Sequence, residues 1–297
     1  MWIQLCTRTA VFRNGYAPAY VGQTVALAYL PSPPFDGLHL GPLHLRIYGV
    51  LIALAAIVAT EWAARRWRAR GGEPREIYRL AAWSLPAGII GARAYHVATD
   101  SELYRGHWLD AFKVWDGGLG IWGGVAAGVV VGLIVARRMR LPGPALLDTV
   151  APAIPLAQAI GRWGNWFNQE LFGRPTRLPW ALHIDASHRP VAFSQYATFH
   201  PTFLYESLWD LAVVAIVLWA ERRLRLRPGY LFAVYVAAYS FGRFFTEWLR
   251  IDNAHRFLGM RLNDWTSVIL FVAATAVLMV GGVRSRGEQE AEPRTVA

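Results

Sequence analysis

Seven mostly apolar segments, each 18 to 20 residues long, alternate along the chain with polar, arginine-rich stretches. A helix needs roughly 17 to 25 such residues to cross a hydrocarbon core of about 30 Å. The pattern therefore predicts seven membrane-spanning helices, at residues 45–63, 80–98, 118–136, 144–161, 202–220, 229–247 and 264–283. Asp148, Pro152 and Pro155 interrupt the fourth segment, which a membrane helix tolerates when neighbouring groups satisfy the freed carbonyls.

The connections between these segments differ in their content of basic residues. Segments 64–79, 137–143, 221–228 and 284–297 contain 16 basic residues, whereas the alternate segments 100–117, 162–200 and 248–263 contain 9 over a greater length. Because arginine and lysine accumulate in short cytoplasmic loops, we expect the N-terminus outside and the C-terminus in the cytoplasm. The long connection 162–200 then lies outside and is expected to form a small extracytoplasmic cap.

Composition agrees with an all-α integral membrane protein. The 297 residues are 55% hydrophobic and only 17% charged. The net charge of +10 does not indicate nucleic-acid binding, because its arginines are spread between apolar runs instead of covering one polar face. The single cysteine, Cys6, excludes an internal disulfide and a cysteine-based metal cage. We expect an N-terminal lead of uncertain role at 1–24, a membrane domain at 25–283 and a tail at 284–297.

The densest polar feature within membrane depth runs from Gly161 to Gly173. On a helix Arg162, Asn165 and Gln169 would share one face, while three glycines indicate that the backbone turns within this run. Such a turn would bring an arginine, two amides and the Glu170 carboxylate together. The alternative is an interfacial loop with a structural arginine–glutamate pair.

Arg243, Glu247 and Arg250 form a second polar group, spaced as one stripe at the end of the sixth predicted span. A guanidinium is well suited to two-pronged binding of phosphate. The alternative is an ion pair within the helix, with arginine side chains reaching the interface. Asp252 points to the opposite side and is expected to be solvated.

Further candidates lie near the same ends of other spans. His200, Tyr205 and Glu206 open the fifth span and are expected either to cap its helix or to line the same outer cavity. Glycines at every fourth position from Gly120 to Gly132 predict close helix packing. Tyr48 fits a membrane-interface residue, and Arg93 fits a partnered interior charge.

These motifs together resemble a known family. The run Gly161–Gly173, with Arg162, Asn165, Asn168 and Glu170, closely resembles the signature of bacterial prolipoprotein diacylglyceryl transferases. The resemblance covers about residues 25–283 and includes Tyr48-Gly49, Gly91-x-Arg93, Trp115-Asp116-Gly117-Gly118, His200-Pro201-Thr202, Tyr205-Glu206, and Arg243-x-x-x-Glu247 with Arg250 and Asp252.

The resemblance implies a transferase for the first step of lipoprotein maturation. Such an enzyme transfers the diacylglyceryl group of phosphatidylglycerol to the thiol of the lipobox cysteine of a prolipoprotein and releases glycerol phosphate. The partners would be phosphatidylglycerol, the lipobox segment and the lipid bilayer, with no cofactor and no metal. A protein that only binds or translocates lipid, or a structural membrane scaffold, is the rival interpretation.

The resemblance also assigns residues. Arg162 and Arg243 would bind the phosphate, and Asn165 and Glu170 would position the headgroup. The supporting residues around the lipid and the cysteine would be Tyr48, Arg93, His200, Glu206 and Glu247, with Gly173 serving the backbone geometry. One departure is Trp122, which stands where many relatives have a histidine proposed as the base, so the proton acceptor stays open, with His200 a chemical candidate.

Overall fold

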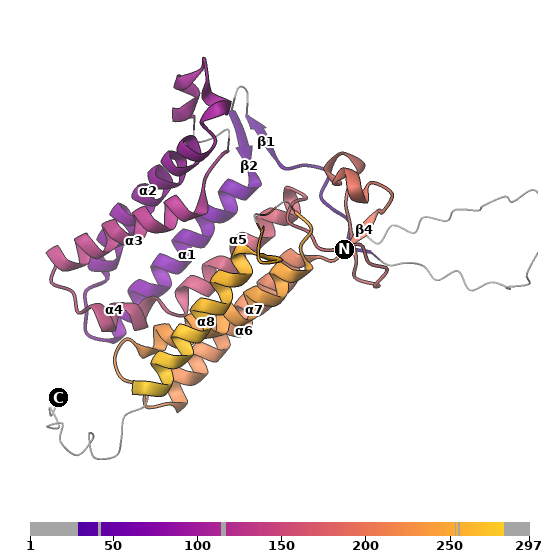
Figure 1. Cartoon of the computed structure of the whole chain (residues 1–297). Coiled ribbons are helices and arrows are strands. Elements are labelled where there is room, and N and C mark those ends of the chain that lie inside the picture. The colour runs from indigo at the N-terminus through magenta and orange to yellow at the C-terminus, as the bar shows by residue number, and fades with distance from the viewer. Residues whose placement is uncertain (1–28, 41–42, 114–116, 253, 255, 282–297) are drawn as a thin grey trace, which may run out of the picture.

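The structure is a computed structural model that describes residues 29–40, 43–113, 117–252, 254 and 256–281. The expected N-terminal lead, the C-terminal tail, and Cys6, Trp115 and Asp116 lie outside these residues. Most of the described chain is helical (Figure 1). Its long helices are α1 (Ile47–Ala69), α2 (Pro74–Thr99), α3 (Ile121–Arg138), α5 (Ala153–Phe167), α6 (Thr202–Arg223), α7 (Tyr230–Leu249) and α8 (Leu262–Gly281).

The helices pack as a row in the order α3, α2, α1, α5, α6, α7, α8 (Figure 1). Within the described residues, four of them, α1, α3, α6 and α8, are long and apolar enough to cross a membrane. Many large apolar side chains on their outer faces are exposed, including Ile57, Val129 and Ile269, as a lipid-facing surface requires. The chain is therefore a mostly helical membrane protein.

The predicted fourth span is divided into the short helix α4 (Gly143–Val150) and α5. Pro152 between them has no N–H to donate to the carbonyl of Asp148. The guanidinium of Arg66 on α1 donates to that carbonyl at 3.2 Å and to the carbonyl of Thr149 at 3.1 Å. The break is thus stabilised by a side chain from a neighbouring helix.

Charged residues connect neighbouring helices on the side where α1 and α6 end and α7 begins. Arg66 forms an ion pair of 2.9 Å with Glu221 near the end of α6. The Asp148 carboxylate accepts hydrogen bonds from the backbone N–H groups of Gly229 at 2.7 Å and Leu231 at 3.0 Å, which satisfies free donors at the start of α7. The charged residue that interrupts the predicted fourth span, Asp148, therefore fixes the start of α7.

The glycine stripe of α3 packs against small residues of α2, as predicted. A Cβ atom added to Gly124 would lie 3.2 Å from the carbonyl oxygen of Gly88, and one added to Gly128 would lie 3.4 Å from that of Ser84. Backbones in such direct contact leave no room for a side chain. The α2–α3 pair is therefore fixed by glycine.

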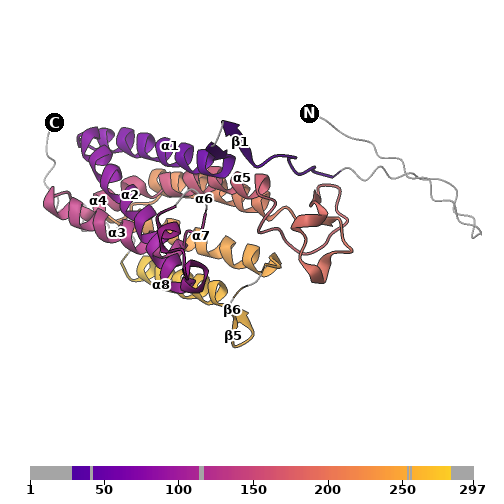
Figure 2. The same cartoon turned by 90° about the horizontal axis from the view of Figure 1, so that it is seen from above.

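At the other ends of the helices, residues 168–200 form a small unit between the end of α5 and the start of α6 (Figure 2). Its strands β3 (Leu182–His183) and β4 (Thr198–Phe199) pair antiparallel, and it also contains short 3-10 helices at Ala186–His188 and Val191–Phe193. Its buried core is apolar and consists of Phe172, Leu182, Ile184, Phe199 and Phe203. The other short elements are the hairpins β1 (Gly37–Leu40) with β2 (Leu43–Arg46) and β5 (Arg256–Phe257) with β6 (Met260–Arg261), and 3-10 helices at Ser101–Tyr104 and Trp108–Phe112.

Candidate active site

Three helices bring two arginines onto one carboxylate. Glu206, in the first turns of α6, forms an ion pair of 2.9 Å with Arg162 on α5 and a second, shorter one with Arg243 on α7. The side chain of Glu206 is only 6% exposed, and those of the two arginines are 18% and 15% exposed. Glu206 therefore links α5 and α7 through its two arginines.

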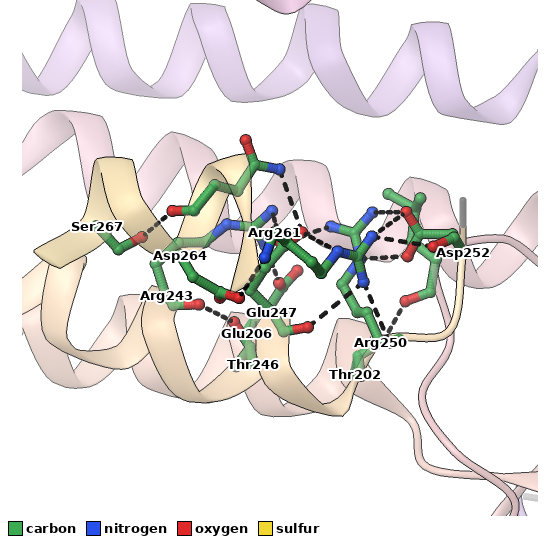
Figure 3. A network of polar contacts seen from close by, with 12 residues as sticks. Thr202, Glu206, Arg243, Thr246, Glu247, Arg250, Asp252, Arg261, Asp264 and Ser267 are labelled. Carbon is green, nitrogen blue, oxygen red and sulfur yellow. Dashed lines mark hydrogen bonds and ion pairs between the residues drawn. The ribbon is translucent and has the colours of Figure 1, made fainter. Parts of the chain in front are cut away.

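A second carboxylate, Glu247, extends this cluster along α7. It is completely buried and forms ion pairs with Arg243 at 2.5 Å, Arg250 at 3.6 Å and Arg261 at 2.9 Å (Figure 3). The Asn263 side-chain amide donates a further hydrogen bond to it at 3.2 Å. Because an unpaired buried charge is very costly, Glu247 and its partners stabilise one another in a fixed geometry.

Asp252 closes the cluster at its other end, so the expectation that this residue is solvated is wrong. It pairs with Arg250 at 2.8 Å and with Arg261 at 2.7 Å and is 28% exposed (Figure 3). Burial alone would raise the pKa of its carboxyl, but the hydrogen bonds and charges of Arg250 and Arg261 hold that pKa below its ordinary value. If α7 continued as a helix, Asp252 would point away from the stripe. The chain instead turns back after α7, and this turn brings Asp252 to the arginines.

The run from Gly161 to Gly173 turns later than its glycines indicate. Helix α5 continues to Phe167, and the backbone takes positive φ angles only at Gln169 and Leu171. Within α5, Gly164 instead leaves room for the side chain of Tyr48, because a Cβ atom at residue 164 would lie 2.2 Å from the ring of Tyr48. Tyr48 thereby packs onto α5, within electrostatic range of Arg162 and Glu170.

After this turn, Glu170 bends back to the amides that precede it. It accepts hydrogen bonds from Asn165 at 2.9 Å and from Asn168 at 3.2 Å. Gln169, expected on the face of Arg162, instead donates to Asp185 in the connection at 2.7 Å. Glu170 and its two asparagines therefore form one polar group at the end of α5.

A small cavity lies between α5, α6 and α7. It is lined by Arg162, Glu206, Trp209, Asp210, Tyr239, Gly242, Arg243 and Thr246. Both arginines of the Glu206 pair thus border the same small space. Because a guanidinium carries five N–H donors, a shared carboxylate leaves donors of each arginine for an anionic group.

The structure places two other predicted site residues in structural contacts. The Arg93 guanidinium donates to the carbonyls of Asp110 at 2.6 Å, Ala111 at 2.7 Å and Gly118 at 3.0 Å, and it also reaches Gly117. It is a partnered interior charge, as expected, and it holds the loop between α2 and α3. The backbone N–H of Gly173 donates to the carbonyl of His200 at 3.0 Å.

The His200 side chain lies beside the start of α6. Its ring nitrogen is 3.2 Å from the hydroxyl of Tyr205. Partial burial and the nearby Arg174 guanidinium lower the pKa of the His200 imidazole below its ordinary value. The imidazole is therefore neutral at pH 7.

Two members of the site were not found from the sequence. Arg261 falls in a connection that contains other arginines, so its charge could be explained by a role in setting the membrane orientation. The hairpin β5–β6 brings it to Glu247. Asp210 has a usable signal, since it follows Glu206 by four residues and so shares its helix face.

These helices and this buried, arginine-rich cluster define a membrane protein with a polar site built where three helices meet. Residues 37–280 match the model of the family described as prolipoprotein diacylglyceryl transferase. The chain belongs to this family and is a transferase.

Individual relatives are similar over most of their length. The phosphatidylglycerol–prolipoprotein diacylglyceryl transferase 2 of Streptomyces coelicolor is 56% identical over 264 residues, which cover 88% of this chain and 83% of the relative. The phosphatidylglycerol–prolipoprotein diacylglyceryl transferase of Cutibacterium acnes is 49% identical over 262 residues, 87% of this chain and 88% of the relative.

Proposed function

We propose that the chain transfers the diacylglyceryl group of phosphatidylglycerol to the lipobox cysteine of prolipoproteins. The family and the names of its relatives support this activity. The observation that carries it is the placement of Arg162 and Arg243 on one cavity. Two guanidiniums held by a shared carboxylate form a rigid binding site for a phosphodiester.

The reaction that follows from this site is a displacement at carbon. The cysteine sulfur attacks the glyceryl carbon that carries the phosphate, the carbon–oxygen bond breaks, and its electron pair stays on the phosphate of the departing glycerol phosphate. Arg162 and Arg243 stabilise the negative charge that develops there, and their orientation is set before the reaction by Glu206. Glu247 contributes indirectly, because it holds Arg243 in place through an ion pair of 2.5 Å.

The remaining candidates act around these two arginines. Glu170, held by Asn165, positions the glycerol of the headgroup, since carboxylate and amide groups hydrogen-bond hydroxyls. Tyr48 lies within electrostatic range of Glu170 and Arg162, beside the headgroup. Arg93, His200 and Gly173 support the site through the loops that they hold.

The proposed topology has seven crossings, with α4 and α5 together forming the fourth. The arginine-rich ends of α1, α3 and α6 then face the cytoplasm. The unit at residues 168–200 forms an extracytoplasmic cap, and the site opens toward the outer leaflet of a bacterial plasma membrane. A labelling experiment on single cysteines introduced into residues 186–188 and 222–223 tests this orientation, since only the former should react with an impermeant reagent.

The activity is tested with purified protein, phosphatidylglycerol and a lipobox peptide. Mass spectrometry should find a diacylglyceryl adduct on the cysteine. Arg162→Ala and Arg243→Ala should each abolish the adduct, whereas Arg65→Ala, whose side chain is 72% exposed on α1, should not. Phosphatidylglycerol binding without any adduct in folded wild-type protein would refute the transferase and favour lipid binding alone.

A further inference from the structure

Asp210 lies on α6 one turn beyond Glu206 and lines the same cavity. It is 2% exposed. Its Oδ2 atom is buried and accepts no hydrogen bond from any residue that the structure describes. A buried carboxylate oxygen without a donor is costly. Its position in the polar cavity indicates a task that the mechanism above does not yet use.

Groups from every helix packed on this part of α6 face Asp210. Arg162 faces it from α5, and Arg243 and Tyr235 face it from α7. On its own helix Glu206 is the nearest charged neighbour. The carboxyl therefore lies between the two proposed phosphate ligands without being locked to either of them by a hydrogen bond at Oδ2.

We infer that Asp210 is the proton acceptor for the thiol of the incoming lipobox cysteine. This inference deepens the proposed function and rests on it. A thiol is mostly protonated at neutral pH, and the thiolate is the nucleophile. A base in the same cavity as the phosphate can remove the proton where the sulfur attacks.

The proton and charge balance supports this role. The S–H bond breaks and its proton passes to Oδ2 of Asp210, the sulfur–carbon bond forms, and the carbon–oxygen bond breaks with its electrons on the phosphate. The phosphate gains one negative charge while Asp210 loses one. Proton uptake thus removes the negative charge of Asp210 near Arg162 and Arg243 at the moment when the phosphate charge grows, and the proton then leaves with the phosphate product.

The other carboxyl groups of the cluster are less suited to accept this proton. Both oxygens of Glu206 are ion-paired, one with Arg162 and one with Arg243. Glu247 is completely buried among three guanidiniums. Trp122 has an indole, which is no base.

The test compares cysteine with selenocysteine in the same lipobox peptide. A selenol is already ionised at neutral pH, so it needs no base. Asp210→Asn should lower the rate with the cysteine peptide by about 100-fold or more and the rate with the selenocysteine peptide by about one tenth of that factor or less. Asp264→Asn is the matched control, since Asp264 is also a buried carboxyl with an unpartnered oxygen but does not line the cavity. It should leave the ratio of the two rates as in wild type.

An equal loss of both rates in Asp210→Asn, or a wild-type rate with the cysteine peptide, would overturn the inference. If that variant does not fold, Asp210→Glu decides: its selenocysteine-to-cysteine rate ratio should rise above the wild-type ratio, and an unchanged ratio would overturn the inference. Wild-type protein that forms no adduct with either peptide would instead remove the proposed function itself.

Discussion

Replacing Glu247 by glutamine tests how far the buried cluster depends on charge. The substitution keeps the shape of the side chain but removes the negative charge that Arg243, Arg250 and Arg261 share at 2.5, 3.6 and 2.9 Å. The hydrogen bond from Asn263 can persist on the amide oxygen, but the amide N–H groups then face a guanidinium. Three arginines are left with the Glu206 and Asp252 carboxylates alone.

The expected loss is large because Glu247 is completely buried. Removing one partner of a buried ion pair costs roughly 3–5 kcal/mol. For a domain of 150 to 250 residues about 1 kcal/mol shifts the unfolding midpoint by roughly 2–4 °C, so a fall of at least about 6 °C is expected. Transfer activity should also fall, because Arg243 loses the group that orients it.

The assay is thermal unfolding in detergent micelles, with Glu61→Gln as the control. Glu61 undergoes the same chemical change, but it forms an exposed pair with Arg65 within α1, and such pairs contribute little. The control should show no resolvable shift. Equal midpoints for Glu247→Gln and wild type would refute the view that this carboxylate organises the cluster.

Three further outcomes follow from packing, loop anchoring and titration. Gly164→Ala should cost about 1–3 kcal/mol, because its Cβ would lie 2.2 Å from the Tyr48 ring; Gly143→Ala, whose Cβ meets no atom within 4 Å, should not destabilise, and equal unfolding midpoints would contradict this packing. Arg93→Lys should speed proteolysis at residues 100–113, because an ammonium group cannot reach four carbonyls as a guanidinium does; unchanged cleavage would contradict the anchoring role. Stability should fall as the pH drops below 3.8, because the pKa of Asp252 in the folded state is lowered from this ordinary value. The stabilisation from Asp252 is complete above pH 3.8 and is lost as the pH falls through the folded-state pKa. Asp252→Asn should remove this part of the loss in acid unfolding curves.

Helix positions could be predicted from hydropathy because lipid-facing helices expose apolar residues along their whole length. All seven predicted segments contain helix, and the α2–α3 contact follows from glycine spacing. The sequence marks Pro152 as an interruption of the fourth segment but does not show that the helix divides there, because the break is stabilised by Arg66, which is far away in sequence. The turn after α5 depends on the backbone at Gln169, not on the glycines that attract attention in the sequence.

For the site, spacing within one helix predicted the Arg243–Glu247 pair. Unexplained charge near the span ends identified Arg162 and Glu206, but not that they pair. Pairing across helices depends on which helices are neighbours in the row, and hydropathy carries no such information. Arg261 belongs to the cluster only because a hairpin reverses the chain, so no local pattern distinguishes it from arginines that orient the protein.

The sharing of Glu206 by α5 and α7 has a consequence for membrane insertion. Chains are synthesised from the N-terminus, so Arg162 enters the bilayer before Glu206 or Arg243 exists. An unpaired arginine within a membrane helix is costly to insert. Under the proposed topology, α5 gains a stable place in the bilayer when α6 supplies the Glu206 carboxylate, and we expect the two helices to insert as a pair.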